Sequence, residues 1–144
     1  MRKYVIELLE EMNGNPDLIE QFARDPVYKQ ILTQLFEYAF LAEKKWILPE
    51  GEPPFKPAAE PMGMTETNLY AEFRRFYVFN RVDLTPLKRE ALFINLLEGI
   101  HPKEAEMLIA VKDQKLHKLY NKITRTAVAK AGFIPNDNSK SKKD

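Results

Sequence analysis

The run from Leu84 to Leu119 constrains the fold most, because it contains two apolar segments that each begin at a proline. Thr85-Pro86 and His101-Pro102 put Pro at a first helical position, where its missing N–H would have no intrahelical partner anyway. Thr is a good N-cap residue and His a poorer one. Glu104 and Glu106 follow in the first turn or so after Pro102, where the helix dipole favours negative charge. The run therefore predicts two consecutive helices.

Apolar residues recur every three to four positions along six segments, as is typical of amphipathic helices. The six sets are Val5/Leu8/Leu9/Met12, Tyr28/Ile31/Leu32/Leu35/Phe36/Ala39, Leu69/Phe73/Phe76/Tyr77, Leu87/Ala91/Ile94/Leu97, Ala105/Leu108/Ile109/Val111 and Ile123/Ala127/Val128/Ala131. Further apolar side chains widen the stripe of residues 87–99, so that this helix should be mostly buried. We expect residues 87–99 and residues 102–111 to form a central antiparallel pair. Four side chains would lie at its heart: Ile94, Leu97, Leu108 and Ile109. Asn15-Pro16 and Asp25-Pro26 predict two more helix starts, and Gly99 and Gly132 predict helix ends.

The segment Arg74–Phe79, RRFYVF, is aromatic and partly β-branched, so that a strand is possible there. The residues before it, TETNLYAEF, have helical character, with Thr65 as the candidate cap. We therefore predict a helix across this region.

Residues 49–64, PEGEPPFKPAAEPMGM, hold five of the ten Pro and two of the five Gly, which excludes a regular element. The segment is either a flexible linker between two helical parts or an extended strap that pins Phe55 and Met62 onto the core. The strap is favoured because long loops in compact domains usually have a role and because the flanking helices are short.

These features predict a single compact all-α domain of six to seven helices over residues 1–134, with the Pro-rich strap at 49–64. Residues 135–144, PNDNSKSKKD, contain no apolar residue beyond Pro and predict a disordered basic tail. With no Cys, disulfides and thiolate chemistry are excluded. No apolar run approaches the roughly 18 residues of a membrane span, and MRKYVIELLEEM has acidic residues where a signal peptide would be continuously apolar.

Charge is distributed unevenly although the net charge is only +1. Residues 1–111 hold 13 Lys/Arg against 18 Asp/Glu, and residues 112–144 hold 9 against 3. Such asymmetry suggests an anionic partner, namely nucleic acid or an acidic protein surface. The alternative interpretation is a solvated basic helix face followed by a disordered tail.

The candidate binding residues are the basic side chains of the 112–130 segment and an Arg pair among aromatics, whose combination is typical of base stacking and phosphate contact. They are Lys112, Lys115, His117, Lys118, Lys122, Arg125, Arg74 and Arg75. Helical spacing would instead place most aromatics near Arg74 and Arg75 in the core. The basic residues of the 112–130 segment are therefore a stronger candidate than Arg74 and Arg75.

Signals for catalysis are missing from the sequence. The two His residues are sixteen positions apart, and no phosphate-binding loop, nucleophile elbow or HExxH motif occurs. Asp83 and the other carboxylates form no paired motif. We therefore expect no enzyme, no metal site and no cofactor.

The chain resembles a family of small uncharacterised proteins of T4-like tailed phages, including cyanophages. The resemblance covers most of residues 30–135 and rests on LPEGEPPFKP, MTETNLYAEFRRFYVF, LKREALFINLLEGIHPKEAEMLIAVKDQKL and ITRTAVAKAGFIP. It implies a phage origin and a helical protein that acts in the infected host cytoplasm or in the virion. It brings no catalytic residues to transfer.

The function expected from these observations is that of a non-enzymatic binding protein. It would engage nucleic acid, or a host or phage protein associated with nucleic acid, through the basic C-terminal surface. A second possibility is a minor virion or assembly protein whose strap and aromatics contact virion proteins or further copies of the chain. No membrane partner is expected.

Overall fold

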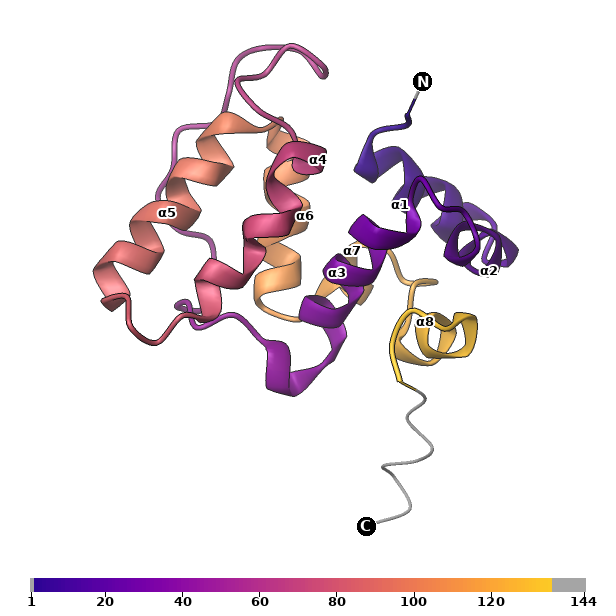
Figure 1. Ribbon diagram of the computed structural model, residues 1–144. Coiled ribbons are helices and arrows are strands. Elements are labelled where there is room, and N and C mark those ends of the chain that lie inside the picture. The colour runs from indigo at the N-terminus through magenta and orange to yellow at the C-terminus, as the bar shows by residue number, and fades with distance from the viewer. Residues whose placement is uncertain (1, 136–144) are drawn as a thin grey trace.

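The structure, a computed structural model, describes residues 2–135, and this range contains α- and 3₁₀-helices but no strand (Figure 1). The elements are α1 (Val5–Gly14), α2 (Asp17–Ala23), α3 (Lys29–Phe40), η1 (Ala42–Lys44), α4 (Leu69–Glu72), η2 (Phe73–Asn80), α5 (Pro86–Gly99), α6 (Pro102–Lys112), α7 (Leu116–Leu119) and α8 (Arg125–Ala131). The all-α fold is confirmed. Six of these α-helices and η2 have at least seven residues, in agreement with the number expected. The predicted tail lies, except for Pro135, outside the described residues.

Helix α6 is the centre of the molecule, because it packs against α1, α3, α5 and α7. Its buried face includes Ala105, Met107, Leu108 and Val111, all of them fully inaccessible to solvent. The predicted pairing of α5 with α6 is confirmed, but α3 covers α6 as extensively as α5 does. Of the four residues expected at the heart of this pair, Leu97 and Leu108 are fully buried, whereas Ile94 and Ile109 are only half-buried.

Helix α5 buries a different face from the one predicted. Leu97 is fully buried as expected, yet Leu87 is 77% exposed and Ile94 is only half-buried. The buried stripe contains Arg89, Phe93 and Leu97 instead. Apolar side chains surround much of this helix, and packing selected the stripe that carries the large Phe ring.

The predicted helix starts at Pro86 and Pro102 are confirmed. The Thr85 hydroxyl oxygen accepts from the Lys88 N–H at 3.1 Å, and His101 Nδ1 accepts from the Lys103 N–H at 3.1 Å. The imidazole therefore caps α6 in the manner of a capping hydroxyl.

The other two prolines stand just before their helices. Pro16 is the N-cap position of α2, and Pro26 lies in a turn that leads into α3. Gly99 ends α5, and Gly132 follows α8 with φ of +97°, a left-handed conformation that glycine adopts without steric cost.

The helix predicted around RRFYVF is present as the 3₁₀-helix η2. Its rings at Phe76 and Phe79 surround Trp46, with centroid distances of 5.4 and 5.1 Å in edge-to-face geometry. Phe93 of α5 completes this cluster at 5.8 Å from Trp46. The aromatic residues of η2 thus anchor α5 to the body of the protein.

Residues 49–64 run without a regular element along α5 toward the start of α4 (Figure 1). The Gly51 N–H donates to Asp113 Oδ2 at 3.1 Å, and the Lys56 N–H donates to Glu98 Oε2 at 2.8 Å. Phe55 and Met62 are half-buried against the core. The segment is therefore the expected strap and not a free linker.

Candidate basic surface and buried charges

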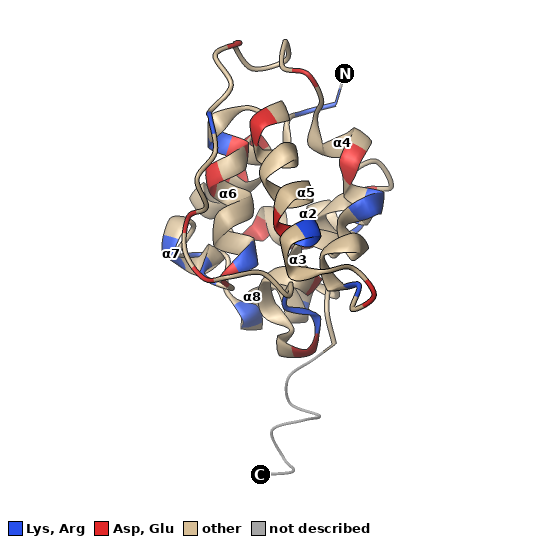
Figure 2. Ribbon diagram, turned by 90° about the vertical axis from the view of Figure 1, so that its left-hand side faces the viewer, with Lys and Arg blue, Asp and Glu red and all other residues tan. Residues whose placement is uncertain are grey.

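Four of the predicted binding residues form an exposed basic face at α7 and the loop after it. We call Lys115, His117, Lys118 and Lys122 the basic face. Lys115 precedes α7, His117 and Lys118 belong to it, and the Lys122 N–H donates to Asn13 Oδ1 at 2.8 Å, which ties the following loop to the end of α1. Figure 2 shows basic residues gathered over α7 and α8.

The basic face carries little compensating charge. No Asp or Glu occurs between residues 114 and 135. Within residues 2–135, none of the three lysines of this face takes part in an ion pair. Acidic groups do border it, since burial together with the nearby charges of Glu10 and Glu106 raises the pKa of Tyr120 to about 12.

Lys112 does not belong to the basic face, which corrects the sequence-based prediction. Its side chain is 1% exposed, and its ammonium donates to the Pro49 carbonyl at 2.7 Å and to Asp113 Oδ1 at 2.5 Å. Although burial acts in the opposite direction, the Lys112 ammonium holds the pKa of the Asp113 carboxyl below its ordinary value. Lys112 therefore anchors the start of the strap.

Arg125 is also engaged within the fold. It is half-buried, and its guanidinium donates to the Phe40 carbonyl at the end of α3. A single basic C-terminal helix is not present, because α6 ends at Lys112 and α7 and α8 are separate short helices. Of the residues predicted on this side, only those of the basic face are exposed.

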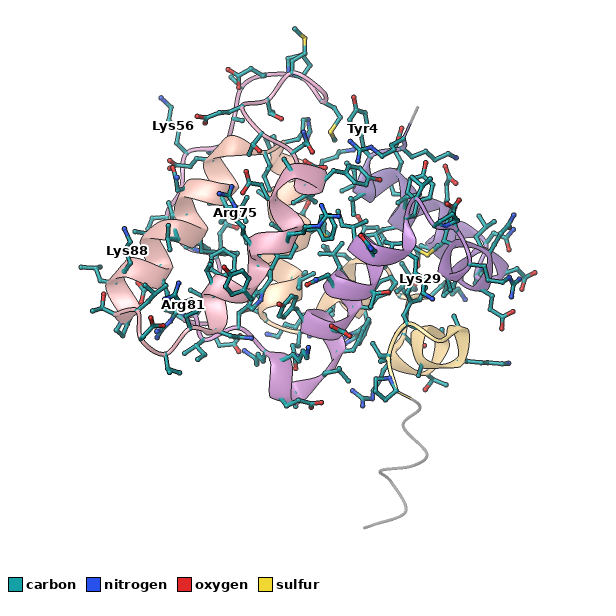
Figure 3. The ribbon with its side chains drawn as sticks, viewed as in Figure 1. Tyr4, Lys29, Lys56, Arg75, Arg81 and Lys88 are labelled. Carbon is teal, nitrogen blue, oxygen red and sulfur yellow. The ribbon has the colours of Figure 1, made fainter. Side chains whose placement is uncertain are left out.

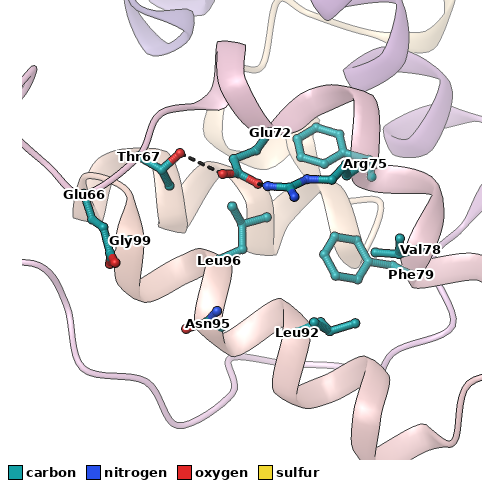
Figure 4. Close-up of a pocket in the computed structure, with 11 residues that line it drawn as sticks. Glu66, Thr67, Glu72, Arg75, Val78, Phe79, Leu92, Asn95, Leu96 and Gly99 are labelled. Carbon is teal, nitrogen blue, oxygen red and sulfur yellow. Dashed lines mark hydrogen bonds and ion pairs between the residues drawn. The ribbon is translucent and has the colours of Figure 1, made fainter.

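Arg74 and Arg75 are not brought to the basic face. They lie on η2, and Figure 2 shows α4, which η2 follows directly, at the opposite edge of the molecule from α7. Arg74 donates to Gln30 Oε1 at 3.2 Å. Arg75 pairs with Glu72 at 2.6 Å (Figure 4). The neighbouring rings of Phe73, Phe76 and Phe79 are buried, as helical spacing predicted, whereas Tyr77 is 54% exposed and is the ring of this segment that a base could reach.

A cleft of about 410 Å³ lies between η2 and α5 (Figure 4). Leu92, Leu96 and Phe79 give it apolar walls, and the Glu72–Arg75 pair lies over them. Both Glu72 oxygens are occupied, because Thr67 Oγ1 donates to the second at 2.7 Å. No free base therefore stands at this ion pair.

A smaller cleft of about 220 Å³ contains a carboxyl group that the sequence marks only as a residue of a helix start. Glu104 of α6 lines it and is 3% exposed. Burial raises the pKa of Glu104 to about 7, against the lowering effect of the His101 backbone. Within residues 2–135 no ion pair involves Glu104. Such a group in a cleft is a candidate functional residue.

Neither buried charge was found from the sequence, although a signal existed. Glu104 and Lys112 lie four residues before and four residues after the fully buried Leu108, and so they fall on the buried stripe of α6. Charged residues on such a stripe are rarely fully buried unless they are paired or serve a purpose.

Metal and membrane sites receive no support from the part of the chain that the structure describes. No three His, Asp or Glu side chains converge there in a way that would hold a metal ion. None of the described helices is long and apolar enough to cross a bilayer. The absence of an enzymatic activity stays a prediction, because clefts of this structure do contain carboxylates.

Comparison with known proteins gives one match. No curated protein and no solved structure matches the chain. The model of a family of unknown function, DUF6433, matches residues 18–118. This range holds the strap, α6 and most of the basic face, and it leaves out α1 and α8. The chain therefore belongs to the DUF6433 family of unknown function.

Proposed function

We propose that this is a non-enzymatic phage protein that binds nucleic acid through the basic face, in the cytoplasm of an infected bacterium. The observation that carries the binding proposal is the exposed cluster of Lys115, His117, Lys118 and Lys122 in a segment without any acidic residue from 114 to 135. The phage origin rests on the resemblance described above. An acidic protein of the nucleic-acid machinery is the alternative partner for the same face.

The face suits phosphate contacts rather than base reading. Its lysines are exposed point charges, Phe133 is buried and Tyr120 is half-buried, so the segment presents charge more than aromatic surface. Helix α7 has only four residues, too few to read a major groove. Binding is therefore expected to be independent of sequence and to depend on salt.

The experiment is a binding titration with a fluorescent 20-base-pair duplex at several salt concentrations. Three phosphate contacts predict that affinity falls by roughly 40-fold between 50 and 200 mM salt. The triple variant Lys115/Lys118/Lys122→Glu should abolish binding. A matched control is Lys29/Lys56/Lys88→Glu, which changes the charge equally at three exposed lysines outside the basic face (Figure 3).

Equal loss in both triple variants would contradict the assignment, because it would show that net charge alone governs the interaction. Absence of binding to duplex and to single strands at 50 mM salt would also contradict it. If an acidic protein were retained by the wild type and lost in the basic-face variant, the alternative partner would replace nucleic acid.

A second candidate function is that of an assembly or minor virion protein. It is favoured by exposed apolar side chains in two neighbouring segments, Ile47 at 44%, Val82 at 84% and Leu87 at 77% exposure. The buried Arg89 holds these segments together by donating to the carbonyls of Ile47, Arg81 and Leu84. Rigid exposed apolar residues are typical of protein interfaces.

Self-association measured by analytical ultracentrifugation tests this second candidate. If the protein oligomerises, Val82→Glu/Leu87→Glu should restore the monomer, and the matched Lys88→Glu should not. A wild type that is monomeric and absent from purified particles would exclude the assembly function.

A further inference from the structure

The cleft beside Glu104 is built by three parts of the chain that are distant in sequence: the N-terminal arm, the end of the strap with α4, and α6. Arg2 and Tyr4 come from the N-terminal arm, Met62–Thr67 from the end of the strap, Tyr70 from α4 and Glu104 from α6. The parts are fastened to one another, since the Tyr70 hydroxyl donates to the Lys3 carbonyl at 2.6 Å. The cleft is therefore a feature of the folded chain and not a gap at a loose end.

Close packing at Gly63 shapes one wall of this cleft. Gly63 has φ of +92°, and a Cβ placed there would lie 2.3 Å from the Tyr4 hydroxyl oxygen. Glycine is thus required both by its backbone conformation and by the approach of the tyrosine. The N-terminal arm and the end of the strap are held in direct contact.

Glu104 is the acidic group of this cleft and has no charged partner within residues 2–135. The backbone of His101 interacts with its carboxyl, as is usual for the third residue of a helix. This contact leaves the charge itself uncompensated, because a backbone N–H carries only a partial charge. A buried carboxylate without a counter-ion is stabilised by any cation that reaches it.

The other charged side chains near Glu104 are already engaged along α1. Glu7 accepts from the Tyr4 N–H at 2.9 Å, and Lys3 pairs with Glu11 at 2.5 Å, so neither Glu7 nor Lys3 is a free partner for Glu104. The remaining cation of the cleft is Arg2.

Arg2 shows that the cleft accepts an organic cation. Its guanidinium carbon lies 4.1 Å from the centroid of the Tyr70 ring, which is cation–π geometry. Arg2 makes no ion pair with Glu104. The aromatic face is thus occupied by a group of the chain itself, while the carboxylate beside it is not.

We propose that this cleft is a binding site for a small organic cation, a guanidinium or alkylammonium, held by the Glu104 carboxylate and the Tyr70 ring, with Arg2 as its intramolecular competitor. The cleft volume of 220 Å³ corresponds to about seven water molecules at roughly 30 Å³ each. It therefore takes a ligand of about seven to ten non-hydrogen atoms. This proposal is independent of the basic face, which lies beyond the opposite end of α6.

The probe is n-propylguanidinium, with the neutral isostere n-propylurea as the control ligand. Both are titrated into the full-length protein, and amide chemical shifts of residues 62–70 and 101–104 are followed by NMR. We expect the guanidinium to bind at least about tenfold more tightly than the urea. Since the pKa of Glu104 is about 7, affinity for the ionised carboxylate should fall about tenfold from pH 8 to pH 6.

Two variants test the assigned roles. Glu104→Gln keeps the shape of the side chain and should remove the preference for the cation over the urea. Arg2→Ala removes the competitor and should strengthen binding by a few-fold. Because binding and protonation are linked, the probe should also lower the pKa of Glu104, observed through its carboxyl ¹³C shift, which a merely structural carboxyl would not show.

Equal binding of guanidinium and urea, or unchanged binding in Glu104→Gln, would overturn the proposal. So would an Arg2→Ala variant that binds the probe no better than the wild type. If n-propylguanidinium caused no shift changes at pH 8 at 50 mM, the site would not exist.

Discussion

The two ends of α6 each bury one ionisable side chain, but only one of the two side chains has a partner of opposite charge. At the C-terminal end, Lys112 is paired with Asp113 and also bonded to a strap carbonyl. At the N-terminal end, Glu104 is buried to a similar degree without an ion-pair partner in the described chain. A buried charge that is fully matched fixes one conformation, whereas an unmatched one costs free energy unless a ligand or a proton arrives.

Removing the lysine should break the matched end most severely. Lys112→Met keeps much of the aliphatic volume but leaves the Asp113 carboxylate enclosed and unpaired, so the free energy of unfolding should fall by about 3–5 kcal/mol. Urea denaturation at pH 7 measures this change. The double variant Lys112→Met/Asp113→Asn should recover part of it, because no unpaired charge remains. A loss below about 1 kcal/mol would show that the pair is solvated.

Leu97→Ala shows how much stability an uncharged core residue of α5 contributes, for comparison with the buried charge at Lys112. Leu97 is fully buried, so the variant should lose about 2–5 kcal/mol of unfolding free energy through lost apolar contact and a cavity. The matched control is Leu87→Ala at the exposed side of the same helix, expected to change stability by less than about 0.5 kcal/mol. A loss below about 1 kcal/mol at Leu97 would mean that α5 packs through another face.

At the N-terminal end of α6, neutralising the buried charge should raise the free energy of unfolding instead of lowering it. Glu104 has a pKa of about 7 in the folded protein and an ordinary value of 4.5, so the folded state holds the proton more tightly. Stability from this group is present below pH 4.5 and is lost as the pH rises through 7. Glu104→Gln, neutral throughout, should therefore be more stable than the wild type at pH 8, by as much as about 3 kcal/mol.

Thermal unfolding of Glu104→Gln and the wild type between pH 4.5 and 8.5 measures this difference. The advantage of the variant should vanish toward pH 4.5. Parallel pH profiles for the two proteins would show that Glu104 titrates normally.

The smallest expected loss of stability comes from removing the N-cap side chain of α6, His101. His101→Ala removes the acceptor of the Lys103 N–H and should cost about 1 kcal/mol, as should Thr85→Ala at the start of α5. Comparing the two variants by chemical denaturation tests whether an imidazole caps as well as a hydroxyl. His101→Asn should retain the stability of the wild type, and a loss equal to that of the Ala variant would contradict the capping role.

Much of the fold could be predicted because its signals are local. Pro86 and Pro102 mark helix starts through their own backbone chemistry, and periodicity marks the helices that follow. The orientation of α5 could not be predicted, because Leu87, Leu92 and Phe93 offer apolar surface on several sides. Only the neighbouring elements determine which of these side chains is covered.

The site was predictable only in part for a related reason. Counting cations located the basic segment, and exposure then separated Lys115 and Lys118 from the buried Lys112. Composition does not distinguish a solvated lysine from one enclosed beside an aspartate. The position of Lys112 on the apolar period of α6 does carry this information, and the same holds for Glu104.

The strap is attached to the helices through its main chain. Lys112 holds the Pro49 carbonyl, Asp113 holds the Gly51 N–H and Glu98 holds the Lys56 N–H. The path of this segment is thus determined by side chains of α5 and of the end of α6, which are far from it in sequence. Apart from the side chains that pack inward and from Gly51 and Gly63, whose φ is positive, we expect substitutions along the strap to leave its course unchanged.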